Sequence, residues 1–229
     1  MHYAPRTIAF VCELLHPPQT PDPAPIQRIH NEMFQGPDPA YQSFHALPQG
    51  AVLSNPVTKP GAASTAEFLA DRIRFREELS GLTVDSFASR IATVVARAAE
   101  LRGLQLFTAQ SVVVRTLVNP RNFADSRTFL KSGMFGFEAE TEAFGRDPQL
   151  LGLRLVFPPS QEEPFAFSLR VESYSNDPRS TFLENHGTFG PTIVARGLES
   201  IGRNIERTYE FVTTRALSFL EQFDARLEA

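Results

Sequence analysis

Proline is distributed unevenly along this chain of 229 residues, and ten of its 18 prolines lie between residues 17 and 60. Proline fixes the backbone angle φ and has no amide hydrogen, so this segment cannot form a long helix or a central strand. We interpret it as a Pro-rich loop region with one short helix, which runs from Pro25 to about Phe34 and ends at Gly36. Most of the regular structure must therefore come from the N-terminal residues and from the chain after residue 60.

Two segments before residue 80 have the pattern of β-strands. Residues 7–15 are apolar on both faces, which is typical of a strand inside a sheet. From residue 66 onward polar and apolar residues alternate, so one face of that strand packs and the other is wet. The wet face carries three arginines spaced about 6.5 to 7 Å apart along the strand, Arg72, Arg74 and Arg76.

The spacing of apolar residues predicts two long helices. The first begins after the N-cap residue Thr83, has apolar residues at steps of three or four, and ends at Gly103. The second covers residues 198–227 and would be about 45 Å long. We expect it to form part of the core, although the same spacing also suits a dimerisation seam. Its apolar stripe includes Phe219, Phe223 and Leu227.

The remaining segments predict further strands and a helical turn. A long strand covers residues 104–118, a helical turn residues 126–132, and three strands residues 150–157, 165–172 and about 180–189. This order does not alternate strictly between strand and helix, so it favours an α+β fold over a parallel α/β fold. We predict a single domain over residues 1–229. It has two layers: a largely antiparallel twisted sheet with helices on one face, and a long C-terminal helix.

Composition excludes several classes of protein. The net charge is −4 and the pI is 5.8, which argues against a basic surface for nucleic acid. The longest uninterrupted apolar run is residues 8–12, far shorter than the 18 or so residues of a membrane span, and no signal peptide is apparent. The single cysteine, Cys12, cannot form an internal disulfide. We therefore expect a cytoplasmic protein with a buried structural thiol and no contact with membranes.

Several segments together resemble a sporadically distributed family of uncharacterised bacterial proteins. They are the N-terminal strand of residues 8–13, the long strand that ends in Arg115, Asn119 and Pro120, the Phe-Ser-Leu-Arg-Val-Glu strand at 167–172, and the terminal helix with Tyr209, Phe211 and Phe219. The resemblance covers nearly the whole chain. It implies a bacterial protein and carries with it no established activity and no catalytic residues.

No motif in the chain indicates a metal, a cofactor or a common catalytic mechanism. The pairs CxxC, HxH and HExxH are absent, and His30 and Glu32 would lie on different faces of a helix. Neither a GxSxG nucleophile turn nor a glycine-rich phosphate loop occurs. We expect no metal and no cofactor, and the motifs leave open whether the protein is an enzyme.

Two hypotheses about function remain. The first is a non-enzymatic binding module, in which Arg72, Arg74 and Arg76 recognise a protein or an acidic ligand; they could equally pair with acids on adjacent strands such as Glu172. The second is a small-ligand binder or an enzyme with a cavity between a curved sheet and the C-terminal helix. Near the mouth of that cavity we expect His186, Glu172 and Arg115. Nucleic acid is not expected as a partner, and a homodimer stays open.

Overall fold

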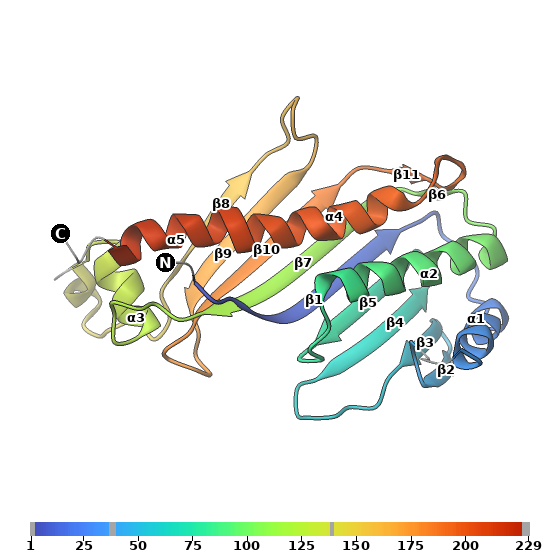
Figure 1. Cartoon of the computed structure of the whole chain (residues 1–229), viewed down its shortest axis with the longest axis horizontal. Helices are drawn as coiled ribbons and strands as arrows, with labels where there is room; N and C mark the ends of the chain where they lie inside the picture. The colour runs from blue at the N-terminus through green and yellow to red at the C-terminus, as the bar shows by residue number, and fades with distance from the viewer. Residues whose placement is uncertain (1–2, 37–39, 138–139, 226–229) are drawn as a thin grey trace.

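The computed structural model describes residues 3–36, 40–137 and 140–225, and it confirms the predicted α+β fold. Nine of the described strands form one antiparallel sheet, and the long helices lie together on one of its faces (Figure 1). Among the described helices, none combines the length and the apolar character needed to cross a lipid bilayer.

The sheet has the strand order β2-β3-β4-β5-β1-β7-β10-β9-β8, and every pair of neighbours is antiparallel. The N-terminal strand β1 is central, as its two apolar faces predicted. A short pair, β6 (Leu106–Phe107) and β11 (Thr192–Ile193), stands apart from this sheet. The nine strands of the sheet are β1 (Arg6–Leu15), β2 (Ser43–Leu47), β3 (Gly50–Ser54), β4 (Ala63–Leu69), β5 (Arg72–Glu78), β7 (Ala109–Val118), β8 (Gly152–Phe157), β9 (Ala166–Ser173) and β10 (Thr181–Phe189).

The helix after Thr83 begins and ends at the residues that the sequence predicted. In α2 (Val84–Arg102), the hydroxyl of Thr83 accepts a hydrogen bond from the amide of Ser86 at 3.2 Å, and Gly103 adopts φ 64°. The C-terminal helix runs from α4 (Glu199–Glu210) through a π-helical stretch, Phe211–Ala216, into α5 (Leu217–Asp224). Shorter helical segments are α1 (Ala24–Phe34), α3 (Ser126–Thr128), the π-helix Phe129–Met134 and the 3₁₀ turns Glu140–Phe144 and Val194–Arg196.

The Pro-rich region contains more regular structure than its composition predicted. Strands β2 and β3 form a hairpin there, and the hairpin lies at one edge of the sheet. Pro48 occupies the turn of this hairpin and Pro56 follows its second strand, so neither proline interrupts a hydrogen-bonded ladder. The predicted strand at 104–118 is also divided, because Thr108 separates β6 from β7.

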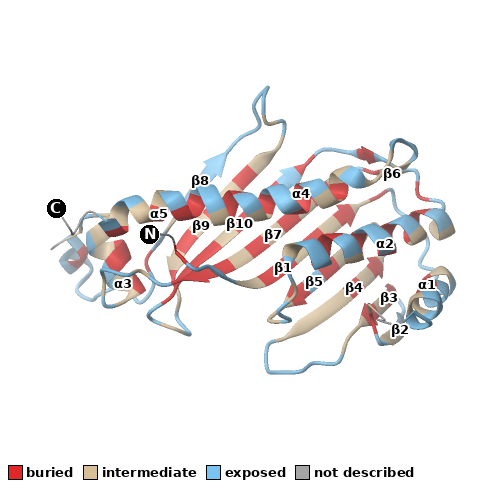
Figure 2. Ribbon diagram, in the orientation of Figure 1, coloured by how far each residue is buried: buried red, intermediate tan, exposed pale blue. Residues whose placement is uncertain are grey.

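The core lies between the helices and the sheet face beneath them (Figure 2). On the C-terminal helix, five apolar residues are at most 1% exposed: Ile201, Ile205, Val212, Ala216 and Leu220. Phe219 and Phe223 are half-buried and pack edge to face, whereas Leu227 lies outside the described residues. Among the described residues, α4 and the π-helical stretch thus pack on the sheet, and α5 packs on the π-helix Phe129–Met134. The buried part of the apolar stripe is therefore already covered within the chain.

A buried polar network holds this helix in register on the sheet. Gln110 of β7 donates to the carbonyl of Ile201 at 3.0 Å and accepts from Asn204 at 2.8 Å. Asn185 of β10 donates to the carbonyl of Thr208 at 3.1 Å. A sliding helix would leave these buried groups without partners, so the network permits one position of α4.

Two halves of the chain repeat the same topology, although the sequence shows no repeat. In each half a strand, a helical segment, a series of hairpin strands and a long helix follow one another. The sheet order 1-5-4-3-2 in the first half corresponds to 7-10-9-8 in the second, and the halves join where β1 pairs with β7. The approximate two-fold axis passes through the pair Val11–Val113. Among the described residues of the second half, no strand takes the position of β2.

Candidate functional site

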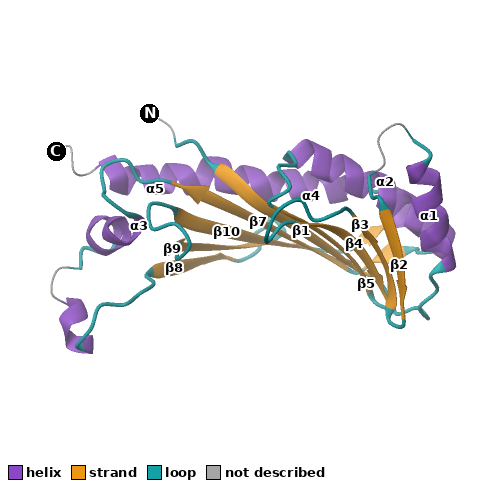
Figure 3. Ribbon diagram, turned by 90° about the horizontal axis from the view of Figure 1, so that it is seen from below, coloured by secondary structure: helices purple, strands orange, loops and turns teal. Residues whose placement is uncertain are grey.

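One face of the sheet has no described helix across it, and we call it the helix-free face. Figure 3 shows α2, α4 and α5 along the other side of the sheet. Because side chains alternate along a strand, the register assigns charged and polar residues to this face. Its main members are Val11, Glu13, Thr65, Glu67, Arg72, Arg74, Arg76, Glu78, Ser111, Val113, Arg115, Arg154, Ser168, Arg170, Glu172, Glu184 and His186.

All six residues that the sequence singled out lie on this face. Arg72, Arg74 and Arg76 project from β5, Arg115 from β7, His186 from β10 and Glu172 from β9. The structure brings them together across four strands, although 114 positions of the sequence separate the first from the last. Sequence alternation predicted the common face of the three arginines, whereas strand order decided that the other three residues share it.

The charges in the first half form a triplet of acid, base and acid. Arg74 of β5 bonds to Glu13 of β1 on one side and lies 3.4 Å from Glu67 of β4 on the other. The three side chains are 23–36% exposed, so each is half-buried. We call Glu67, Arg74 and Glu13 the first triplet.

The second half carries the inverse arrangement of base, acid and base. Glu184 of β10 accepts from Arg115 of β7 at 2.7 Å and lies 3.4 Å from Arg170 of β9. We call Arg170, Glu184 and Arg115 the second triplet.

The two triplets occupy equivalent places in the two halves of the sheet. The approximate axis at Val11–Val113 relates Glu13 to Arg115, and the registers of the outer strands then relate Arg74 to Glu184 and Glu67 to Arg170. Every charge in one triplet is thus matched by the opposite charge in the other. The first triplet thus has a net charge of −1 and the second a net charge of +1, in similar geometry.

The other two arginines of β5 also have acidic neighbours. Arg72 contacts Asp71 at 2.9 Å, and this hydrogen bond raises the pKa of its guanidinium group. Arg76 contacts Glu78 at 2.7 Å, which likewise raises its pKa, and Glu78 contacts Arg115 at 3.1 Å. The partners of the three arginines are therefore acids on β1, β4 and β5 and in the β4–β5 turn.

Glu172 is not a partner of these arginines. It belongs to β9, and three strands lie between β9 and β5; its carboxylate lies 3.5 Å from Arg170 on its own strand.

His186 forms a hydrogen bond with Ser111 on the neighbouring strand, with 2.7 Å between Nε2 and the serine Oγ. Within the described part of the chain no carboxylate bonds to this ring. Both residues lie in the middle of paired strands, whose amides are committed to the sheet ladder. The pair therefore lacks the backbone donors and the orienting acid that support a nucleophilic serine.

The predicted cavity beside the C-terminal helix does not involve the residues we expected at its mouth. His186, Glu172 and Arg115 all point away from that helix, because the strand register assigns them to the opposite face. A pocket of about 190 Å³ does lie between the helix and the β8–β9 hairpin. Its lining consists of Glu163, Phe165, Phe167, Arg207, Glu210, Phe211 and Arg215.

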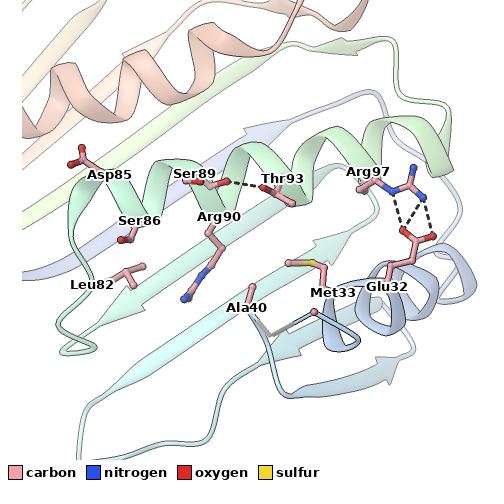
Figure 4. Close-up of a pocket in the computed structure, with 11 residues that line it drawn as sticks. Glu32, Met33, Ala40, Leu82, Asp85, Ser86, Ser89, Arg90, Thr93 and Arg97 are labelled. Carbon is pink, nitrogen blue, oxygen red and sulfur yellow. Dashed lines mark hydrogen bonds and ion pairs between the residues drawn. The ribbon is translucent and has the colours of Figure 1, made fainter. Parts of the chain in front are cut away.

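A larger pocket, of about 800 Å³, opens between α1 and α2 (Figure 4). At its rim Arg97 of α2 bonds to Glu32 of α1 at 2.8 Å. Deeper in the fold, Arg90 bonds to the buried carboxylate of Glu77 at 2.6 Å and lies 5.3 Å from the centre of the Tyr41 ring. Burial raises the pKa of Glu77 although Ser64 and Arg90 donate hydrogen bonds to it. No local pattern in the sequence marks this cluster, since its members have no common spacing.

No protein-family model and no curated protein matches this chain. Within residues 3–36, 40–137 and 140–225, no three side chains of His, Cys, Asp or Glu gather in a way that could hold a metal ion.

Proposed function

We propose that this protein is a non-enzymatic interaction module, and that it recognises a protein partner through the helix-free face. The observation that carries the proposal is the pair of charge-inverted triplets on this face. A large, half-exposed array of ordered charges, with no element of the described chain across it, offers a surface that a partner of complementary charge can cover.

A protein fits this face better than a nucleic acid or a small acidic ligand. Phosphate groups favour arginines that are free of competing carboxylates, whereas each arginine of β5 already contacts an acid. A partner with both signs of charge can instead pair with both triplets. We place the protein in the cytoplasm as part of this proposal, because the buried free thiol of Cys12 suits a reducing compartment.

The proposal is tested with a triple variant in which Arg72, Arg74 and Arg76 are replaced by Gln. The purified protein is immobilised and used to capture partners from a lysate of its source cells at low and high salt, and the captured proteins are identified by mass spectrometry. We expect the wild type to retain a defined partner at low salt and to lose it as salt screens the charges. The triple variant should retain much less of that partner.

A second triple variant provides the control. It replaces three exposed arginines outside the helix-free face by Gln: Arg179, Arg196 and Arg203. The change in net charge is the same as in the first triple variant, but the helix-free face is left intact. This variant should capture the partner as the wild type does. Equal recovery by all three proteins, or an equal loss in both variants, would contradict the proposal.

A further inference from the structure

Strand β8 leaves one edge of the sheet open. It pairs with β9 on one side, and no described strand pairs with its other side. Val156 is 65% exposed and Phe157 40% exposed, and the strand contains no acidic residue and no lysine. Natural proteins usually protect such an edge with charges, prolines or a covering element, since its unpaired amides and carbonyls can bind another strand.

The first half of the molecule shows what the equivalent edge looks like when it is covered. The approximate two-fold axis relates β8 to β3 and, by the strand registers, Leu155 to Leu53. Leu53 is fully buried because β2 pairs with β3 and places Phe44 beside it. Leu155 is half-buried, because nothing in the described second half takes the place of Phe44. The described part of the second half therefore lacks a strand beside β8.

We propose that a second copy of this chain supplies that strand, through antiparallel pairing of β8 with β8 of the other copy. Such a contact is isologous, so one two-fold axis completes it and joins the two sheets into one. Side chains of paired residues point to the same face, and a self-paired strand must therefore be centred on one residue. The register centred on Leu155 places Leu155 against its own copy, Leu153 against Phe157 and Arg154 against Val156.

Charge and burial favour this occupant and this register. Arg154 is the one charged residue of β8, and centring on Leu155 keeps the two copies of Arg154 apart. A register centred on Arg154 would instead place two guanidinium groups opposite each other, which destabilises a strand pair. The Leu155 register covers Val156 and Phe157 on both copies and places a leucine where Phe44 lies in the first half. The contact is made through the backbone edge of β8, which belongs to neither charge triplet, although Arg154 and Val156 also point to the helix-free face.

The test is the molar mass of the full chain in solution, measured by light scattering and sedimentation over micromolar concentrations. We expect the wild type to approach twice the 25.5 kDa of one chain as its concentration rises. Val156→Lys places a lysine opposite Arg154 twice in the dimer, and should raise the dissociation constant at least about tenfold. The control is Val57→Lys, because Val57 is 70% exposed and lies in a loop away from β8. It should leave the dimer unchanged.

A charge exchange then tests the register. The double variant Arg154→Glu with Val156→Lys places opposite charges against each other in the Leu155 register, and should restore most of the affinity lost in Val156→Lys. Circular dichroism of each variant checks that it is folded. A monomeric wild type, including one that binds a strand from a different protein, would overturn the proposal, as would a dimer that Val156→Lys leaves intact. Failure of the double variant to recover would overturn the Leu155 register.

Discussion

Asp224 joins three parts of the chain that are far apart in sequence, and its removal should destabilise the fold. Its side chain is 5% exposed and accepts hydrogen bonds from the hydroxyl of Tyr3 at 2.7 Å and from the amides of Arg121 and Asn122 at 2.9 and 3.0 Å. Burial, together with this neighbouring carboxylate, raises the pKa of Tyr3, so its hydroxyl stays a donor. The N-terminal segment, the loop after β7 and the end of the C-terminal helix thus meet at one carboxylate.

The cost of Asp224→Ala follows from the donors it leaves behind. The buried hydroxyl of Tyr3 loses its acceptor at about 1 to 3 kcal/mol, and the two half-buried amides, which water can partly reach, lose about 0.5 to 1.5 kcal/mol each. We expect a loss of about 2 to 6 kcal/mol, a large share of the 5 to 15 kcal/mol typical of a folded domain. Tyr3→Phe removes one of these bonds and should cost about 1 kcal/mol.

The measurement is urea unfolding followed by far-ultraviolet circular dichroism, because the chain contains no tryptophan. Asp147→Ala serves as the control, since Asp147 is an exposed partner of Arg127 and should change stability by no more than about 0.5 kcal/mol. If Asp224→Ala cost no more than Asp147→Ala, the hydrogen bonds at Asp224 would contribute nothing net and the reasoning would be wrong.

Three further predictions concern buried groups. Burial raises the pKa of Cys12 to about 12, so a thiol reagent at pH 8 should label the unfolded protein and leave the folded protein unlabelled; rapid labelling of the folded protein would contradict this. The pKa of Glu77 is raised in the folded protein, so the protonated carboxyl group stabilises the fold. This stabilisation is complete below the unfolded pKa of about 4.3 and is lost as pH rises through the folded pKa. The difference in unfolding free energy between wild type and Glu77→Gln should therefore shift in favour of the wild type as pH falls from 7 to 4, and a difference independent of pH would refute it. Gly50→Ala would make the new Cβ atom clash with the carbonyl oxygen of Phe68, and should lower the free energy of unfolding by about 2 to 4 kcal/mol. Gly202→Ala is the control: this position lies in a helix with open space around it, so the change should be neutral or stabilising. Equal melting temperatures of the two variants would show that the backbone yields at Gly50.

The sequence alone determined the elements whose signals are local. The cap at Thr83, the stop at Gly103 and the steps of three and four between them define α2 without reference to any other part of the chain. Strict alternation likewise defined the packed and wet faces of β9. The hairpin of β2 and β3 was missed because prolines at its turn and end look, in sequence, like prolines that prevent a strand.

The candidate site was predictable only in part. Alternation showed that Arg72, Arg74 and Arg76 share a face, since that depends on spacing within one strand. The acids that meet these arginines come from strands paired at distances along the chain that no local pattern specifies, such as Glu13 opposite Arg74. For the same reason His186 was expected beside the C-terminal helix, although its strand turns it toward the opposite face.

What only the tertiary structure decided is how the strands are ordered, and every larger feature follows from that order. Pairing β1 with β7 at the centre creates two similar halves, sets one charge triplet against its inverse, and leaves β8 with an open edge. The contact between Tyr3 and Asp224 spans 221 residues. Local propensity acts over a few residues, whereas the choice of strand neighbours depends on burying all apolar faces at once, and that balance exists only in the folded chain.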